Sequence, residues 1–408
     1  MVNTHLVPDK WNVSRIIDIV ENIIDYRGRT PLKLGMEWGK GDIPALSARN
    51  VKMGRIDFEE ETYYGSEDLY NRWMSNNCTK KDDIVITTEA PLGNVALIPD
   101  DSKYILSQRT ILLQINPTIV FNRFLYHYFV SKQFQNILAK HSTGSTAKGI
   151  QRKKFETLEI IYPPLPEQTA IAAALSDADT LITSLDRLIT KKRNIKQATM
   201  QKLLTGKKRL PGISSEWEIQ ELRTIVKEFI VPMRDKPKVF RGDIPWCRIE
   251  DFNGKYLDGS KSGQHVDKEI INGMNLKIHP FGTLLVSCSA DLGRCAIIRK
   301  PLVTNQTFIG LVVDESKLLN EFLYYYMTFN ADELNNISSG TTISYLSREL
   351  FESFKVYIPI NKEEQTAIAT VLSDMDTEIA ELEEKRDKAR MIKEGMMQEL
   401  LTGRIRLV

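Results

Sequence analysis

The sequence is poor in the features that mark a membrane, secreted or zinc-binding protein. Its 408 residues include only four cysteines, and these form no CxxC pair and no zinc-ligand spacing. Reduced thiols in a cytoplasmic protein are the simplest interpretation. No run of 18 apolar residues is present, and the first residues lack the apolar core of a signal peptide. We therefore expect a cytoplasmic protein without a membrane span.

The sequence also lacks an excess of charge of either sign. Lysine and arginine total 55 against 53 aspartates and glutamates, which gives a formal net charge of +2. Many nucleic-acid-binding domains have an isoelectric point above 9, so the overall charge does not by itself indicate DNA binding. A content of 42% hydrophobic and 26% charged residues excludes a disordered or fibrous chain. The length predicts two or three domains.

Motifs that bind nucleotides or catalyse reactions are missing. The string at 144–149 lacks the spacing and the Lys-Ser/Thr pair of a P-loop, and no GxGxxG follows an expected strand. Tyr162–Leu165 contains two prolines without a preceding Asn, Asp or Ser, so we interpret it as a strand exit, not as the catalytic loop of an amino-methyltransferase. Asp83 and Glu89 resemble a nuclease metal pair, but no Glu-x-Lys follows and 287–290 offers no matching acids. An autonomous nuclease or methyltransferase is therefore disfavoured, and no metal site is expected.

The chain is instead a tandem duplication of a unit of about 200 residues. The segments Glu167–Gly206 and Glu364–Gly403 share 23 identities in 40 positions, and both end in LLTG. The string GDIP occurs at Gly41 and again at Gly242, in the same order relative to the helical segments. What is duplicated is scaffold, because the five histidines and the acidic residues near Asp83 are not repeated.

Each repeat divides into a mixed part and a helical part. The β-branched runs at 82–88 and 281–289 predict strands, and 121–138 and 320–334 predict helices. We therefore expect an α/β (α+β) fold with these divisions: a first mixed domain at 1–160, a central helical region at 161–210, a second mixed domain at 211–360 and a C-terminal helical region at 361–408.

Both helical regions carry apolar residues at alternating spacings of four and three, which is the seam of a coiled coil. The two helices can pair antiparallel and be related by a pseudo-twofold axis. The alternative, that each helix packs only on its own domain, is disfavoured because the stripe is narrow. The two helical regions have opposite net charge, which favours their pairing. Region 161–215 has nine basic and four acidic residues, and region 361–408 has eight basic and eleven acidic residues. The predicted seam residues are Ile171, Leu175, Ile182, Leu185, Ile189, Ile368, Leu372, Met375, Ile379 and Leu382.

Polar and basic residues in loops differ between the two repeats while the scaffold persists. Arginine recognises guanine edges and Asn or Gln recognises adenine edges, whereas Ser, Thr and Lys hold phosphates. Each residue alone is most simply a solvated loop residue, but recurrence at equivalent places favours DNA binding. The candidates are Arg27, Arg29, Thr30, Arg49, Asn50, Thr88, Asn94, Gln108, Arg109, Lys148 and Arg152 in the first domain, and Arg234, Lys236, Lys238, Arg248, Asp251, Ser289, Arg294, Asn305, Gln306, Ser344 and Arg348 in the second.

A family resemblance is carried by the paired EQTAIA and LLTG helices, the GDIP strands, Ala90–Asn94 with Gln108-Arg109, and Pro163–Gln168. In these residues the chain resembles the specificity subunit of type I restriction-modification enzymes. The resemblance covers essentially the whole chain. It implies two target recognition domains, similar to those of adenine-N6 methyltransferases and separated by an antiparallel coiled coil. Each would recognise one half of an asymmetric bipartite DNA target through the major groove.

The resemblance also implies a non-catalytic subunit without a cofactor of its own. Its partners would be double-stranded DNA, two methyltransferase subunits that use S-adenosylmethionine, and restriction subunits that use ATP and magnesium. Asp291 stands where the first repeat has Pro91, so individual loop contacts do not transfer directly between repeats. The alternative function is a free-standing DNA-binding regulator or scaffold with two recognition domains.

Overall fold

A computed structural model describes residues 7–144, 148–212, 216–232, 236–288, 291–337 and 347–407. The chain forms two compact units: unit 1 comprises Met1–Asp186 and Glu384–Val408, and unit 2 comprises Arg187–Glu383. These units differ from the four segments expected from the sequence, because each long helix is divided between both units. Among the described residues, no helix is long and apolar enough to cross a membrane.

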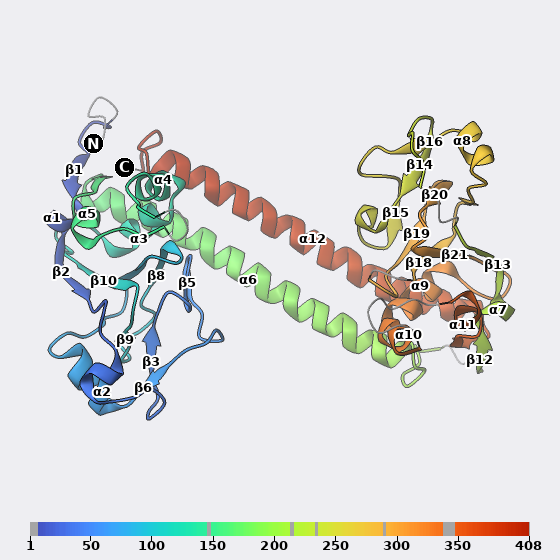
Figure 1. The fold of residues 1–408 in the computed structure, drawn as a ribbon, viewed down its shortest axis with the longest axis horizontal. Helices are drawn as coiled ribbons and strands as arrows, with labels where there is room; N and C mark the ends of the chain where they lie inside the picture. Colours follow the sequence, from blue (N-terminus) through green and yellow to red (C-terminus); the bar gives the residue numbers. More distant parts are fainter. Residues whose placement is uncertain are drawn as a thin grey trace. The chain divides into compact units, whose positions relative to one another are not determined.

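Unit 1 is built on a four-stranded antiparallel sheet in the order β2-β10-β7-β8 (Figure 1). The predicted strand at 82–88 is β7, whose sequence Ile-Val-Ile-Thr-Thr is buried throughout because both faces of the sheet are covered. The strands of unit 1 are β1 (Asn12–Arg15), β2 (Val20–Asp25), β3 (Ile43–Leu46), β4 (Val51–Lys52), β5 (Arg55–Ile56), β6 (Tyr64–Gly65), β7 (Ile84–Thr88), β8 (Leu92–Leu97), β9 (Ile105–Leu106), β10 (Thr110–Ile115) and β11 (Glu159–Tyr162).

Short helices cover this sheet and carry the loops that follow it. The helix predicted at 121–138 is two helices, because the Ser131 side chain accepts a hydrogen bond from Phe134 N and caps a second helix. The short helices of unit 1 are α1 (Ile16–Ile19), η2 (Pro31–Leu34), α2 (Glu67–Met74), α3 (Asn122–Val130), α4 (Lys132–Lys140) and α5 (Arg152–Glu156).

Unit 2 repeats the plan with a five-stranded sheet in the order β13-β21-β18-β19-β15. The predicted strand at 281–289 is β18, and the helix predicted at 320–334 is again two helices. The elements are β12 (Trp217–Glu221), α7 (Leu222–Ile225), β13 (Val226–Ile230), β14 (Ile244–Cys247), η3 (Ile249–Asp251), β15 (Tyr256–Leu257), β16 (His265–Val266), α8 (Lys268–Gly273), β17 (Ile278–His279), β18 (Leu284–Ser287), β19 (Cys295–Ile298), β20 (Leu302–Thr304), β21 (Phe308–Val313), α9 (Asn320–Phe329), α10 (Ala331–Ile337), α11 (Arg348–Glu352) and β22 (Lys355–Pro359).

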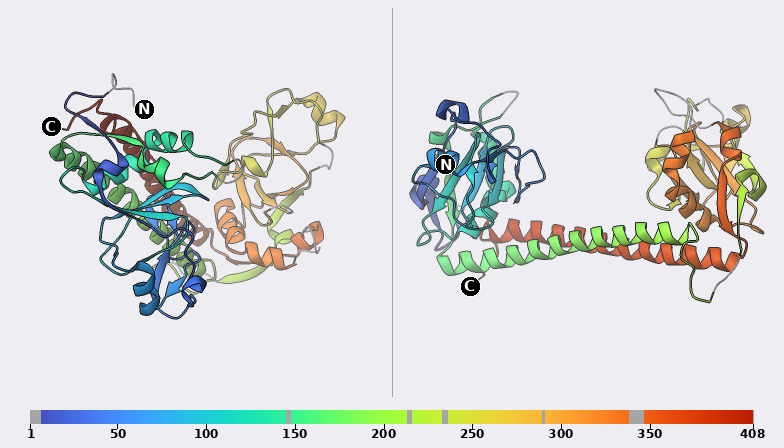
Figure 2. Two further views of the ribbon diagram at one scale, coloured as in Figure 1. Left: turned by 60° about the vertical axis from the view of Figure 1, so that its left-hand side comes forward. Right: turned by 90° about the horizontal axis from the view of Figure 1, so that it is seen from below.

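The two long helices, α6 (Leu165–Leu203) and α12 (Lys362–Leu400), pair antiparallel within each unit (Figures 1 and 2). In unit 1, Asp179 pairs with Lys393 and Asp186 pairs with Arg390, so residue numbers rise along one helix as they fall along the other. In unit 2, Lys192 pairs with Glu378, and Lys196 pairs with Asp376. In unit 2 the bases belong to α6 and the acids to α12, which is the sense that the charge pattern predicts. In unit 1 the sense is reversed, because the acids belong to α6 and the bases to α12.

Only part of the predicted seam lies between the helices. Ile171 and Leu175 belong to the hydrophobic core of unit 1, and Ile368 and Leu372 belong to that of unit 2. The first turns of each helix therefore pack on a domain, as the disfavoured alternative supposed. Further along the helices, Ile189 and Ile379 are buried, whereas Ile182, Leu185, Met375 and Leu382 are half-buried.

Each unit is completed by residues from the end of the other repeat's helix. Leu400 and Leu401 of α12 and its following turn lie in the core of unit 1, and Leu203 and Leu204 at the end of α6 lie in the core of unit 2. The LLTG string shared by the repeats is therefore a docking segment, and this explains why both copies retain it.

Glutamine in the shared EQTAIA string fixes the start of each long helix. The side chain of Gln168 accepts from Phe121 N at 2.7 Å and donates to the carbonyl of Pro163 at 2.8 Å. Gln365 accepts from Leu319 N at 2.8 Å and donates to the carbonyl of Pro359 at 2.9 Å. Both side chains are fully buried, so the hydrogen bonds satisfy groups that would otherwise be costly to bury.

Candidate DNA interface

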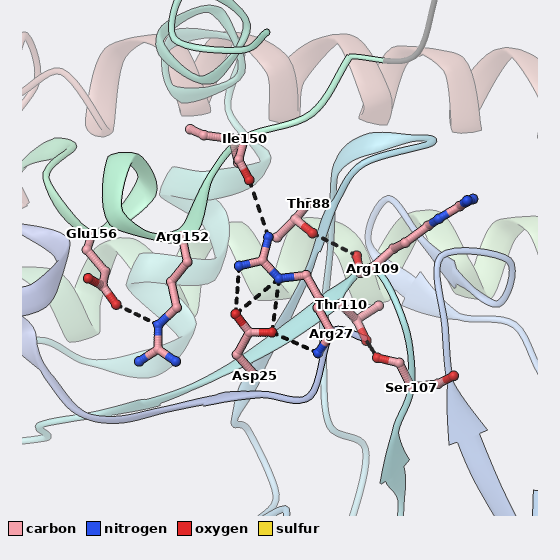
Figure 3. A network of polar contacts seen from close by, with 9 residues as sticks. All are labelled: Asp25, Arg27, Thr88, Ser107, Arg109, Thr110, Ile150, Arg152 and Glu156. Carbon is pink, nitrogen blue, oxygen red and sulfur yellow. Dashed lines mark hydrogen bonds and ion pairs between the residues drawn. The ribbon is translucent and has the colours of Figure 1, made fainter. Parts of the chain in front are cut away.

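One edge of the unit 1 sheet gathers the loops that carry candidate residues. β10 runs antiparallel to β2 and β7, with Ile111 opposite Asp25 and Thr110 opposite Thr87. The ends of β2 and β7 and the start of β10 therefore meet. The segment after Gly149 joins them, because Ile150 N donates to the carbonyl of Thr88 at 2.9 Å. Figure 3 shows this convergence of loops from four parts of the sequence.

Arg27 is held in place at this edge by Asp25. Its guanidinium donates to both carboxylate oxygens, from Nε at 2.9 Å and from Nη2 at 2.6 Å (Figure 3). Burial alone would raise the pKa of Asp25, but the hydrogen bonds and charge of Arg27 lower it. Asp25 therefore remains ionised and orients a half-buried guanidinium, which suits the paired hydrogen bonds of guanine recognition.

Arg109 stands beside it on a constrained backbone. Its φ is +65°, and its carbonyl accepts from Thr88 N at 2.8 Å and from the Thr88 hydroxyl at 3.2 Å. Its side chain is 52% exposed, with Nε 3.1 Å from the carboxylate of Glu89. Thr88 is buried and supports Arg109, so it is not placed to contact DNA directly.

Other candidates of unit 1 surround this edge. Arg152 donates from Nε to Glu156 at 2.7 Å (Figure 3). Lys148 is exposed in the segment before it. Arg29 lies over the ring of Tyr26 at 4.4 Å, and its carbonyl accepts from the side chain of Gln108 at 3.3 Å. The Thr30 hydroxyl caps the short helix η2.

Three further candidates of unit 1 are engaged in contacts with the protein itself. Asn50 is fully buried; its side chain accepts from Ser47 N at 2.8 Å and donates to the carbonyl of Ala45 at 2.8 Å, so it shapes its own loop. The Asn94 amide donates to the carbonyl of Val51 at 3.0 Å. Arg49 is exposed and paired with Glu61.

Unit 2 presents the equivalent sheet edge with different side chains. Cys288 N donates to the carbonyl of Thr307 at 2.8 Å, which is the counterpart of the hydrogen bond between Thr88 and Arg109. Gln306 is exposed there, and Asn305 accepts from the Thr307 hydroxyl at 2.7 Å. Arg348 pairs with Glu352 as Arg152 does with Glu156 in unit 1.

Basic residues of unit 2 gather around two aromatic side chains, a buried Trp246 and a half-buried Phe240, that the sequence reasoning missed. Trp246 lies 5.7 Å from Lys236 Nζ and 5.7 Å from the guanidinium carbon of Arg248, and Phe240 is 5.9 Å from the same lysine. The signal was available, because Trp246 follows GDIP directly, between two basic loops.

The remaining candidates of unit 2 have mixed positions. Asp251 is buried and accepts from Arg248 N and Lys261 N, both at 2.7 Å, so it shapes the loop. Arg294 donates to the carbonyl of Phe252 at 3.1 Å, and Lys238 is exposed. The candidates outside the described residues are Arg234, Ser289 and Ser344.

The acidic residues weighed as a nuclease pair are separated. Asp83 precedes β7, is buried and accepts from Lys80 N at 2.9 Å, and burial raises its pKa. Glu89 follows the other end of β7. In the part of the chain that the structure describes, no three His, Cys, Asp or Glu side chains are grouped to hold a metal ion.

Comparisons with known proteins agree with this arrangement. The family model of the type I restriction modification DNA specificity domain matches residues 8–197 and again 215–389. The MjaVIII specificity subunit of Methanocaldococcus jannaschii is 25% identical over 435 residues, covering 98% of this chain and 94% of the relative. The EcoprrI specificity subunit of Escherichia coli is 29% identical over 180 residues, covering 41% of this chain and 43% of the relative.

Solved structures share the fold. The S subunit of the type I restriction-modification system from M. genitalium has a TM-score of 0.61 at 17% identity, covering 98% of this chain and 97% of that one. A chain from a structural study of the complex assembly and conformational transition of the type I R-M system has a TM-score of 0.61 at 18% identity, covering 98% and 99%. With both repeats matched by the family model, this chain belongs to the type I restriction-modification DNA specificity family.

Proposed function

We propose that each unit recognises one half of a bipartite DNA target through the sheet edge described above, and that the chain has no catalytic activity of its own. The observation that carries this proposal is the convergence of Arg27, Arg109 and Arg152 at one edge of unit 1. The equivalent edge of unit 2 offers Gln306 and Asn305, so the same scaffold presents different hydrogen-bonding groups. Different groups at one edge fit recognition of two unlike half-sites.

Base recognition and backbone contact are divided between residues in this proposal. Arg27 and Arg109 contact base edges, because a guanidinium gives the paired hydrogen bonds that guanine accepts. Lys148 and Arg152 contact phosphates, which position the protein without selecting a sequence. This proposal gives no DNA contact to Asn50, Asn94 or Asp251, because their side chains form hydrogen bonds with backbone groups.

The proposed partners are two methyltransferase subunits that use S-adenosylmethionine, and through them restriction subunits that use ATP and magnesium. Relatives along the whole chain are specificity subunits of type I restriction enzymes, which supports an assembly of this kind. A net charge of only +2 also fits a subunit whose partners supply much of the attraction to DNA phosphates. The pure chain should neither methylate nor cleave DNA, and should gain methylation when its methyltransferase subunit is added.

Substitution of Arg27 tests the interface. Arg27→Ala should cost about 1–3 kcal/mol of binding free energy and relax recognition at one target position, measured by methylation mapping with the methyltransferase subunit present. Arg123→Ala is the matched control, because Arg123 forms a similar half-exposed ion pair with Asp82 at the other end of the strands. An unchanged affinity and methylation pattern for Arg27→Ala would place DNA recognition elsewhere.

A further inference from the structure

A second basic surface lies beside the candidate interface of unit 1. It is a cleft of about 270 Å³ where α4 and α5 end and β11 begins. Its polar rim consists of Lys140, His141, Lys154, Thr157 and Glu159. Two ammonium groups against one carboxylate give the side chains of the cleft a net positive charge. The charges of Lys154 and Lys140 add to burial in lowering the pKa of His141.

The loop that joins α4 to α5 connects the cleft to the candidate interface. The loop begins at His141 in the cleft and is closed by hydrogen bonds of 2.9 Å in both directions between Thr143 and Gly149. Beyond Gly149 it reaches the sheet edge, where Ile150 bonds to Thr88. The cleft therefore lies at the start of the same loop whose other end presents Arg152.

The lysines of the cleft differ in partnership from the arginines of the interface. Arg27, Arg109 and Arg152 each form an ion pair with a carboxylate. Lys140 and Lys154 form no ion pair with any of the residues that the structure describes. Charges of this kind are free to bind an anion without first breaking an ion pair.

Unit 2 builds the same scaffold without these lysines. The sequence Arg152-Lys153-Lys154 at the start of α5 corresponds to Arg348-Glu349-Leu350 at the start of α11, where Glu352 keeps the ion pair that Glu156 makes in unit 1. Lys140 at the end of α4 corresponds to Asn336 near the end of α10, because Ser142 after α4 matches Ser338 in the second repeat. The fold therefore does not require the lysines of unit 1.

We propose that this cleft binds a phosphate of the DNA backbone next to the half-site recognised by unit 1. The proposal rests on the proposed function and extends it, because unit 1 would then make a contact with the DNA phosphate backbone that unit 2 does not make. A phosphate diester fits the ammonium groups of two exposed lysines, which act as point charges without selecting a sequence.

The salt dependence of DNA binding by the full-length chain tests the proposal. The probes are a duplex carrying the target found by methylation mapping and an unrelated duplex of equal length. For Lys140→Ala/Lys154→Ala, the slope of log affinity against log salt concentration should fall in magnitude by about 1, which corresponds to one lost phosphate contact, on both duplexes. The mapped target sequence should not change.

Lys153→Ala is the matched control. Lys153 is exposed on the same short helix, carries the same charge and does not line the cleft. The salt slope of Lys153→Ala should stay closer to the slope of the unsubstituted chain than the slope of the single variant Lys154→Ala does. Phosphate ethylation interference should show one position next to the half-site that matters for the unsubstituted chain and for Lys153→Ala, and that no longer matters for the double variant.

Three outcomes would overturn the proposal. The first is an unchanged slope and ethylation pattern in the double variant. The second is competition by millimolar inorganic phosphate beyond that of chloride at equal ionic strength, which would assign the cleft to a free anion. The third is loss of methyltransferase binding with DNA binding intact, which would assign it to a protein partner. Failure of the proposed function is a separate result, since the unsubstituted chain would then bind the target and unrelated duplexes equally.

Discussion

Arg406 and Glu167 are joined by two hydrogen bonds of 2.7 Å, although 239 residues separate them in the chain. The guanidinium of Arg406 also lies 5.8 Å from the ring of Trp11. In unit 2, Arg209 makes the same contacts with Glu364, at 2.5 and 2.6 Å, and with Trp217, at 5.7 Å. Each unit is thus closed by an arginine that follows the other repeat's long helix.

Removal of Arg406 should destabilise unit 1. Glu167 is 3% exposed, so Arg406→Ala leaves a buried carboxylate without its partner. We expect a lower melting temperature by calorimetry, and partial recovery when Glu167→Gln is added, because the neutral amide is less costly to bury. Arg404→Ala is the control, since Arg404 is exposed and pairs with Glu399, which is only half-buried. Equal melting temperatures for Arg406→Ala and Arg404→Ala would contradict this account.

Unit 1 should lose stability as the solution becomes mildly acidic. His127 is buried, and burial, with the charges of Lys393 and Arg123, lowers its pKa to about 3. In the unfolded chain a histidine titrates near pH 6.5, so the unfolded state binds a proton first as the pH falls. The contribution is present above about pH 6.5 and is lost progressively below it, by roughly 2 kcal/mol at pH 5.

Comparison of unfolding free energies at pH 7.5 and pH 5 measures this effect. In His127→Gln the loss on acidification should be smaller by roughly 2 kcal/mol than in the unsubstituted chain. Ser176→Ala is the control, because it removes the hydroxyl 3.2 Å from His127 Nε2 but keeps the titrating ring. An identical loss in His127→Gln and the unsubstituted chain would show that another group is responsible.

The paired helices should set the spacing between half-sites. Because α6 and α12 each pass from one unit into the other, insertion of four residues in both adds about 6 Å of helix. The unread spacer, about 6–7 base pairs for half-sites one turn of DNA apart, should lengthen by roughly one or two base pairs with the half-sites unchanged. Methylation mapping decides this, and altered half-sites with an unaltered spacer would rule it out.

Residues 1–210 should form a working half-subunit that dimerises. In a symmetric pair, Lys196, Arg193 and Arg209 of one copy take the places of Lys393, Arg390 and Arg406 opposite the other copy. The ion pairs to Asp179, Asp186 and Glu167 are therefore kept. Leu203 and Leu204 replace Leu400 and Leu401 in the core of unit 1.

The dimer carries a cost in charge, because nine basic and four acidic residues at 161–215 now face a copy of themselves. Salt should therefore strengthen it. Light scattering should report a dimer, and methylation mapping with the methyltransferase subunit should report an inverted repeat of the first half-site. A fragment that stays monomeric at high concentration and high salt would show that the two helices are not interchangeable.

The sequence predicts what its repetition and periodicity encode. The strands β7 and β18 and the antiparallel pairing of α6 with α12 follow from β-branched runs and heptads, because local patterns determine them. The burial of Asn50 and Asp251 could not be predicted, since a polar residue in a loop can bond to its own backbone as well as to DNA. Arg406 was also missed, because its contacts with Glu167 and Trp11 are long-range and leave no local signal.

The discontinuity of unit 1 has a consequence for the order in which the chain is synthesised. Unit 2 is one continuous stretch, Arg187–Glu383, whereas unit 1 needs Leu400, Leu401 and Arg406 from the final residues. Until the second repeat has left the ribosome, the core of unit 1 lacks Leu400 and Leu401, and the LLTG segment of the first repeat has no unit 2 core to pack on. Neighbouring nascent chains on one messenger carry the same two unfinished surfaces, so until the second repeat is complete an exchange of ends between neighbours would bury the same residues as docking within one chain.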